Sequence, residues 1–328
     1  MRFIKANFPA DKADAVIAIV ERANPVDWSV DSGYGRFEKA IEIVVETGRG
    51  QGLVDDLQSL LSGSPDWRVV VLPVEATLPR PEAPEPTDEK VSTTSLREEL
   101  YAKVDRDCTL NSDFILLTVL SSIVAAIGLN GDSVAIVIAA MVIAPLLGPI
   151  LAFALATALG DMSLMRKASK TAVTGLVVGF VFALALTLIV PVNMESLELT
   201  SRAVIGPEIV VLALASGAAA ALSLSTGISS ALVGVMVAVA LLPPSVASAL
   251  FLGAGDYDRA QGAALLLGLN VVCAILSAQL VFAYKGLRPR RWTSQQKAGR
   301  AQRLNIIVWC VLLLLLVALA YRLNIRLT

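Results

Sequence analysis

Two stretches of sequence decide the fold: MVIAPLLGPILAFALATALGD at Met141–Asp161 and MVAVALLPPSVASALFLGAGD at Met236–Asp256. They align without a gap at an offset of 95 residues, and ten of the 21 positions are identical. Both are apolar and long enough to cross a bilayer, and each has a proline near its middle, Pro149 in the first and Pro244 in the second. We predict that they are equivalent broken helices in two repeats, and that the breaks mark the functional site.

The composition indicates a membrane protein. The chain has 328 residues, of which 55% are hydrophobic and 17% are charged, and most of the apolar residues follow residue 110. A soluble domain of this size could not bury so much apolar surface, so we expect a multispan α-helical protein whose main partner is the lipid bilayer. The net charge of -1 gives no indication of a nucleic-acid partner. Because there is no histidine and the three cysteines are scattered, we expect no metal site and no cofactor.

Residues 1–76 have the pattern of a soluble, cytoplasmic α+β domain. Their alternating and helical apolar spacings predict the order βαββαβ, which is typical of a ferredoxin-like fold. Gly48, Gly50 and Gly52 fall between a predicted strand and a predicted helix. Their backbone N–H groups could bind an anion or a small effector, or the glycines could form only a flexible turn at the start of the helix.

A linker and a helix connect this domain to the apolar part of the chain. Residues 77–94 are rich in proline and glutamate, which predicts an extended linker. Residues 95–110 predict an amphipathic helix, because Leu96, Leu100 and Val104 share one helical face. Three arrangements stay open for this helix: on the membrane surface, packed on the helical bundle, or solvated as a simple connection.

Seven apolar segments follow, each long enough to cross a hydrocarbon core of about 30 Å. They lie at 113–129, 133–159, 170–191, 208–224, 228–254, 261–284 and 305–322. If all seven cross, most Lys and Arg residues fall on one side, and the positive-inside rule predicts an inner-membrane protein with a cytoplasmic N-terminus and an outside C-terminus. Residues 285–304 then form a basic cytoplasmic loop. The seventh span lies outside the repeat, and we expect it to contact another copy in a homo-oligomer.

The 95-residue offset extends beyond the opening stretches, so that the three spans of 113–191 repeat as those of 208–284. Since three is an odd number, the second repeat starts on the opposite side of the membrane and is inverted. Inverted repeats with interrupted helices are a recurring plan of transporters, whose sites lie near the midplane. Alternatively, the prolines and small residues serve helix packing alone. The candidate residues for binding a substrate or ion are Ser121, Pro145, Gly148, Pro149, Ser216, Pro243, Pro244 and Ser245.

The acidic residues of this region lie at the predicted ends of spans. Their absence from the midplane favours a neutral solute or a small ion over a proton relay. Gly253–Asp256 resembles the GxGD pattern of intramembrane aspartyl proteases, and Asp161 is the conceivable second carboxylate. The inverted topology puts Asp161 and Asp256 on opposite faces of the membrane, so we expect no catalytic residue and no enzyme.

The stretch SDFILLTVLSSIVAAIGLNGDSVAIVIAAMVIAPLLGPILA, at Ser112–Ala152, resembles the prokaryotic family called domain of unknown function 389. The resemblance covers about residues 95–285. It implies an integral membrane protein of undetermined activity, often with an extra soluble domain, and it carries over no functional residue. Two hypotheses therefore stay open: a transporter or channel with a regulatory or assembly domain, and a membrane-anchored ligand-binding or signalling protein in which the helical bundle is a scaffold.

Overall fold

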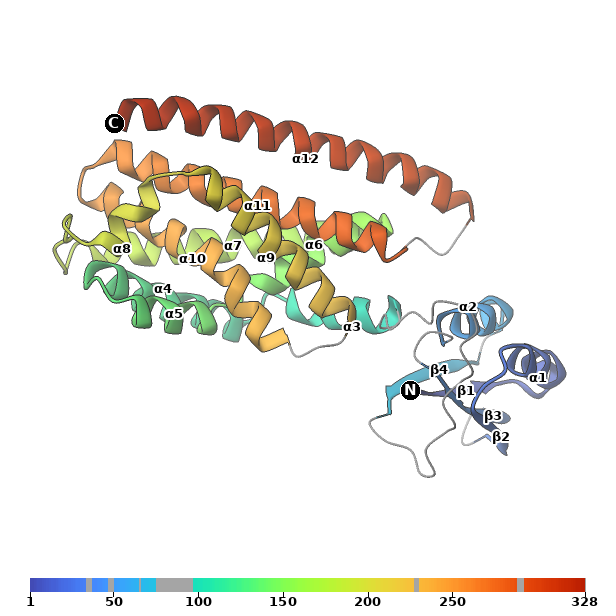
Figure 1. The fold of residues 1–328 in the computed structure, drawn as a ribbon. Coiled ribbons are helices and arrows are strands. Elements are labelled where there is room, and N and C mark those ends of the chain that lie inside the picture. The colour runs from blue at the N-terminus through green and yellow to red at the C-terminus, as the bar shows by residue number, and fades with distance from the viewer. Residues whose placement is uncertain are drawn as a thin grey trace. The chain divides into compact units, whose positions relative to one another are not determined.

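The computed structural model describes residues 1–33, 37–46, 50–64, 66–74, 97–226, 230–287 and 292–327, without the side chains of 230–240, 292–304 and 323–327. The chain divides into two compact units, Met1–Leu100 and Tyr101–Thr328. The described part is mostly helical, and a small antiparallel sheet lies in the first unit (Figure 1). The predicted linker at 77–94 falls outside the described residues.

The first unit has the predicted order βαββαβ. Its elements are β1 (Arg2–Phe8), α1 (Ala13–Arg22), β2 (Asp27–Ser32), β3 (Lys39–Val45), α2 (Gly50–Leu61) and β4 (Arg68–Pro73), with the 3₁₀ turn η1 (Ala10–Lys12) before α1. The strand order is β2-β3-β1-β4, and every neighbouring pair is antiparallel. The assignment of this unit to the ferredoxin-like class stays a prediction.

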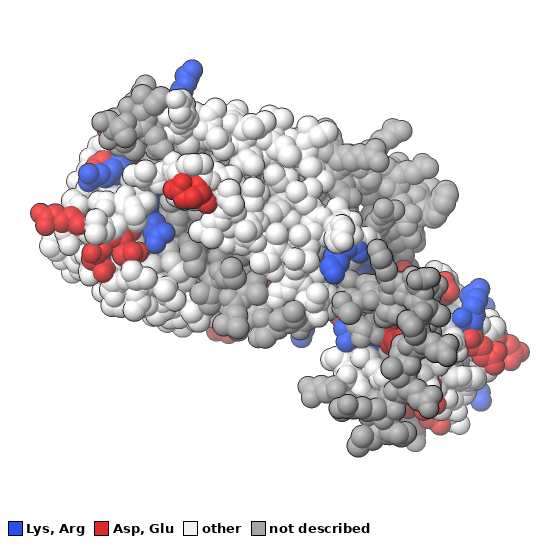
Figure 2. All heavy atoms as spheres, in the orientation of Figure 1, with Lys and Arg blue, Asp and Glu red and all other residues white. Residues whose placement is uncertain are grey.

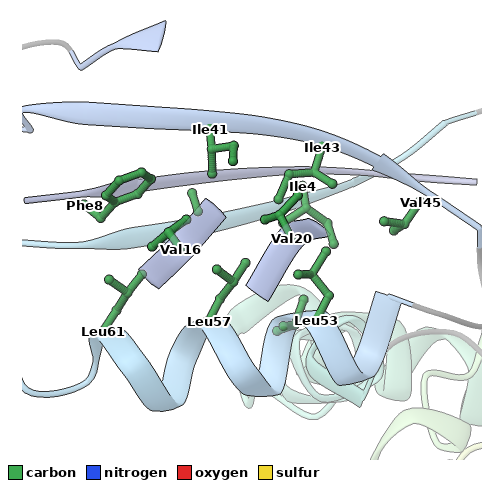
Figure 3. Close-up of a cluster of buried hydrophobic side chains, with 12 residues drawn as sticks. Ile4, Phe8, Val16, Val20, Ile41, Ile43, Val45, Leu53, Leu57 and Leu61 are labelled. Atoms are coloured by element: carbon green, nitrogen blue, oxygen red, sulfur yellow. The ribbon is translucent and has the colours of Figure 1, made fainter. Parts of the chain in front are cut away.

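The core of the first unit explains why these segments form these elements. Alternate residues of β1, such as Ile4 and Phe8, turn to one face of the sheet and are fully buried, as a strand's twofold period requires. Leu53, Leu57 and Leu61 follow at helical spacing in α2 and are also buried. Figure 3 shows these side chains and those of α1 meeting between the helices and the sheet.

The second unit contains the apolar helices. They are α4 (Ser112–Asn130), α5 (Val134–Ile143), α6 (Leu147–Leu159), α7 (Met162–Leu186), α9 (Pro207–Thr226), α10 (Ser230–Gly253), α11 (Tyr257–Tyr284) and α12 (Trp292–Leu327). A short helix, α8 (Leu197–Thr200), and the 3₁₀ turn η2 (Ser201–Ala203) precede α9. Within the described residues, five helices are long and apolar enough to cross a membrane, or six if α5 and α6 count as one span. The predicted total of seven spans stays a prediction.

The surface of this unit suits a bilayer. On the face that Figure 2 shows, charged side chains gather toward the ends of the helical unit, and the surface between them is largely uncharged. Large apolar side chains are exposed on several helices of this unit, for example Val177 of α7 and Val211 of α9. In water such an exposed apolar belt would be unfavourable, whereas hydrocarbon chains would cover it. Multiple apolar helices of this kind support a membrane protein.

The predicted basic loop at 285–304 includes the start of α12, which begins at Trp292 and continues into the seventh apolar segment. The Gln, Lys, Ala and Arg residues of 295–303 are strong helix formers, so this connection is largely helical, and its cytoplasmic side stays a prediction. One prediction about these helices is wrong, namely that both long spans are broken. The first long span is interrupted, with a bend of 53° between α5 and α6, but α10 is one helix that contains Pro243 and Pro244.

Candidate functional site

The interruption lies at Pro145. Ala144 has an extended backbone (φ -66°, ψ 122°), as expected for a residue that precedes proline. Pro145 has no N–H group, so the carbonyl of Met141 loses the donor that a continuous helix would supply. Helix α6 then begins without a side-chain hydrogen bond at its N-cap, Leu146. Pro149 is the third residue of α6, where backbone N–H groups have no partner in the helix anyway, so it begins a helix and does not break one.

A cavity of about 290 Å³ lies beside this interruption. Three parts of the chain line it: helix α3 (Arg97–Asp107), the α5–α6 junction, and the second half of α9. The lining residues are Lys103, Val104, Asp107, Pro145, Leu147, Gly148, Leu151, Ala220, Ser223 and Leu224. The lining is mostly apolar, with two charged residues and one hydroxyl. A volume of this size suits a small solute or a partly hydrated ion.

Of the predicted binding residues, Pro145 and Gly148 line this cavity. Ser121 and Ser216 are buried elsewhere, and each donates its hydroxyl hydrogen bond within its own helix, to the carbonyls of Thr118 and Leu212. Such backbone bonds satisfy the hydroxyl without a ligand. The other predicted residues, Pro149, Pro243, Pro244 and Ser245, are buried and are not among the lining residues. A role for them in binding stays a prediction.

Helix α3 forms one wall of the cavity, and glycine at position 148 permits it to do so. A Cβ atom added to Gly148 would lie 2.5 Å from the carbonyl oxygen of Asp107 and 2.9 Å from its Cβ. Real Cβ atoms do not approach other atoms so closely, so the end of α3 can rest on the start of α6 only because residue 148 has no side chain.

Polar contacts hold α3 and Cys108, the residue after it, on the helical unit. The Tyr101 hydroxyl donates to Asp161 at 2.9 Å, and Lys167 Nζ binds Asp105 at 2.6 Å. A further contact joins the Thr171 hydroxyl to the carbonyl oxygen of Cys108, at 2.8 Å. Val104 and the Cys108 thiol are buried on the same side. From Tyr101 onward this segment therefore packs on the helical unit, and its place at the membrane surface stays a prediction.

The environment of α3 changes the acidity of two of its groups. Burial raises the pKa of the Tyr101 hydroxyl to about 12, and the hydrogen bond to Asp161 contributes in the same direction. Burial also raises the pKa of Asp107, against the opposing charges of Lys103 and Arg106. Lys103 and Asp107 are one turn apart and both line the cavity, yet no ion pair joins them in the described part of the chain. Their charges remain available to a solute.

The two aspartates of the protease-like pattern have structural roles. Asp161 is the N-cap of α7 and accepts hydrogen bonds from the backbone of Ser163 and Leu164. Asp256 is the N-cap of α11 and accepts from the backbone of Arg259. Each is preceded by a glycine with positive φ, 68° at Gly160 and 80° at Gly255. A glycine that ends one helix and an aspartate that caps the next account for both Gly-Asp pairs.

The predicted effector loop is only partly described. Gly48 lies outside the described residues, Gly50 is the buried first residue of α2, and Gly52 has open space around its Cα. In the same unit, the side chain of Gln51 accepts a hydrogen bond from the Arg97 backbone at 2.8 Å. This segment therefore positions the start of α3, and an effector there stays a prediction. Among the described residues, no group of three or more His, Cys, Asp or Glu could hold a metal ion.

Comparisons with known proteins identify the family. An uncharacterised protein of Methanocaldococcus jannaschii is 31% identical over 312 residues, which cover 95% of this chain and 96% of the relative. The family model described as domain of unknown function 389 matches residues 141–276. The chain belongs to this family. No solved structure matches it.

The segment that matches the model of domain of unknown function 389 contains seven of the ten cavity residues, from Pro145 to Leu224. The other three, Lys103, Val104 and Asp107, come from α3, which precedes the matched segment. The sequence predicted Val104 as part of the apolar face of α3, but it did not single out Lys103 and Asp107. In the sequence, Lys103 and Asp107 are distinguished only by their position next to the apolar face of α3. That position points to a site only once α3 is known to lie over α6.

Proposed function

We propose that this protein is a transporter or channel for a neutral solute or a small ion, with its site at the α5–α6 junction. The observation that carries the proposal is a helix interruption that opens onto a cavity of about 290 Å³. Broken backbone at membrane depth is tolerated where it is buried in protein or lines a water-filled space. The cavity also joins α6 of the predicted first repeat to α9 of the predicted second repeat, the place where transporters of this plan bind their substrates.

The boundaries of the helices support the internal repeat. Helix α9 begins 95 residues after α4, and α11 begins 95 residues after α7. The residues before the last helix of each half also correspond, since Asp161 and Asp256 are both N-caps that follow a glycine with positive φ. Two helix starts, and the aspartate cap at the second of them, therefore recur at the offset that the sequence identities predicted.

Side-chain contacts support the repeat at finer detail. A Cβ atom on Gly179 of α7 would lie 2.6 Å from the hydroxyl oxygen of Ser122 in α4. A Cβ atom on Gly217 of α9 would lie 2.6 Å from the Cα of Ala274 in α11. Gly217 stands 95 residues after Ser122, and Ala274 stands 95 residues after Gly179. The same two positions therefore make the close helix contact in each half, with the glycine on opposite partners, as small-residue packing in membranes permits.

The direction of the helices supports inversion. In Figure 1, α4 begins at the end of the helical unit where α3 lies, and α9 begins near α8 at the other end. We place the α3 end on the cytoplasmic side of the inner membrane and the C-terminus outside, because the basic residues around α3 and the start of α7 obey the positive-inside rule in that orientation. The exposed apolar side chains of α12, from Ile307 to Tyr321, would face lipid or another copy in a homo-oligomer.

Flux through proteoliposomes tests the proposal. Vesicle swelling in glycerol or urea gradients reports neutral solutes, and ion-sensitive dyes report K⁺, Na⁺ and chloride. We expect at least one probe to cross faster than in protein-free vesicles. Pro145→Ala should slow it, because a restored N–H group favours a continuous helix across the cavity wall. Val177→Leu, on the exposed face of α7, is the matched control. If every probe crosses both kinds of vesicle at one rate, transport of these classes is refuted and the scaffold hypothesis is favoured.

A further inference from the structure

We infer that the protein works by alternating access, and that this structure is the state open toward α3, with a closed counterpart of the cavity between α10 and α4. The inference rests on the proposed function and says how access to that same site changes from one side of the membrane to the other. It separates a carrier, whose two sides open in turn, from a channel, whose two sides open together.

The counterpart follows from the 95-residue offset. Applied to the lining residues of α6 and α9, the offset leads to the middle of α10 and the second half of α4, two helices that pack against each other. The counterpart residues are Leu242, Pro243 and Val246 of α10, and Ala125, Gly128 and Leu129 of α4. The structure thus offers two related places, one in each half of the membrane.

The counterpart is packed shut. Leu242 is 1% exposed and Leu129 is fully buried, and Val246 and Ala125 are equally inaccessible. At the cavity, by contrast, Leu147 and Gly148 of α6 are only half-buried. On the α9 side, Ala220 and Leu224 line the cavity but are as buried as their counterparts in α4, so the difference between the halves lies at α6. Equivalent positions therefore line an open space in one half and a closed contact in the other. Such asymmetry between two similar halves is what a carrier open to one side requires.

The two long apolar segments, α5–α6 and α10, also differ between the open and the closed half. The first is interrupted and bent by 53° between α5 and α6, whereas α10 runs as one helix through two prolines. The chain therefore accepts prolines inside a continuous helix at this depth, as membrane helices do when neighbouring groups satisfy the freed carbonyls. Exchange of the two conformations, with α10 broken and α5–α6 straightened, would close the present cavity and open its counterpart.

The ends of the two halves carry a matching charge pair. The offset relates Lys103 and Asp107 of α3 to Glu198 and Arg202 beside α8. Glu198 and Arg202 form an ion pair at 3.1 Å in the closed half. In the open half, within the described residues, Lys103 and Asp107 line the cavity without such a pair. The signs are reversed but the spacing is the same, so each pair forms when its own side is closed. The buried residues beside them, Val104 and Leu199, correspond in the same way.

Cysteine accessibility from the two sides tests this inference without the substrate. Cys108, Cys273 and Cys310 are first replaced by alanine. Leu224→Cys then reports the cavity, and Leu129→Cys reports its counterpart. Full-length protein in oriented vesicles is treated with a membrane-impermeant maleimide on either side. We expect Cys at 224 to react from the α3 side, and Cys at 129 to react more slowly, from the opposite side.

The charge pair provides the perturbation. Arg202→Ala removes the pair of the closed half, and loss of one part-exposed i,i+4 ion pair should raise labelling at 129 by about twofold. Labelling at 224 should fall in the same variant, because the opening of one side closes the other. The double exchange Glu198→Arg with Arg202→Glu restores the pair with reversed signs, and both labelling rates should return toward those of the parent.

The outcomes separate this inference from the proposed function. If Arg202→Ala raises labelling at 129 while labelling at 224 is unchanged or also rises, the two sides open independently and alternating access is overturned, although transport through a channel survives. If labelling is reciprocal but no probe is transported, the two-state inference stands and the proposed transport fails. If the double exchange labels like Arg202→Ala, the pair is not the closing contact and the inference is overturned at this point. Thermal unfolding checks that each variant is folded.

Discussion

Glycine at position 148 should decide whether α3 can rest on the helical unit. In Gly148→Ala the new methyl group would sit 2.5 Å from the Asp107 carbonyl oxygen, which is backbone and cannot rotate away. Overpacking of this kind costs about 1–3 kcal/mol. If that cost falls on the docked state of α3, the ratio of undocked to docked molecules rises by about 5-fold to 150-fold. We therefore expect α3 to be released in a measurable fraction of molecules.

The native Cys108 reports this release. Its thiol is fully buried beside α3, and burial also raises its pKa, so the docked protein should react slowly with a maleimide. In a background with Cys273→Ala and Cys310→Ala, the labelling rate of Cys108 should rise in Gly148→Ala. Gly268→Ala is the matched control, because the nearest atom to its new methyl group is 4.0 Å away. If Gly148→Ala folds and labels no faster than Gly268→Ala, the close approach of α3 to α6 is refuted.

Three further predictions concern the same helices. Lys167→Ala should lower the free energy of unfolding by up to about 1 kcal/mol, the size of one part-exposed ion pair, whereas Lys170→Ala, on the exposed side of α7, should not. The pKa of Tyr101 is raised from 10.0 to about 12, so its stabilising effect should be complete below pH 10 and disappear as the pH rises through about 12. Tyr101→Phe should abolish this contribution, so the difference in thermal unfolding between parent and variant should vanish as the pH rises from 10 to 12. Gly217→Ala should destabilise the protein more than Gly179→Ala in thermal unfolding, because the first methyl group meets the backbone of Ala274 as well as the Ser277 hydroxyl, and the second meets only a hydroxyl that can rotate.

The sequence predicted the elements whose apolar period is unambiguous. Alternation in β1 and β3 and helical spacing in α1 and α2 each place one face in the core, so the order of the first unit followed from pattern alone. The apolar spans followed from length for the same reason. The start of α12 lies before the apolar segment, because arginine, lysine and glutamine also favour helices and apolar length alone marks only the part that could cross a membrane.

The site was harder to predict because it depends on differences between the repeats. Identity between the halves drew attention to the shared pair Pro149 and Pro244, yet the interruption lies at Pro145, whose counterpart is Ala240. A shared proline can begin a helix in one half and lie inside a helix in the other, and only the path of the backbone distinguishes the two. The sequence could not predict the contribution of α3 either. Lys103 and Asp107 line the cavity only because α3 packs against residues that lie about 40 positions later in the chain.

That difference between Pro145 and Ala240 supplies the strictest test of the two-state inference. If the repeats are mechanically equivalent, the double variant Pro145→Ala with Ala240→Pro should move the interruption from the first half to the second, since proline disfavours a helical residue before it and removes one helical hydrogen bond. With the cysteine reporters, position 129 should then react rapidly from the side opposite α3, and position 224 should become protected. The exchange does not alter Gly148 or the α3 contacts, so any change in labelling is attributable to the moved proline. If 224 stays reactive and 129 stays protected in a folded double variant, the asymmetry belongs to the two halves themselves, and the closed contact between α10 and α4 is a permanent part of the fold.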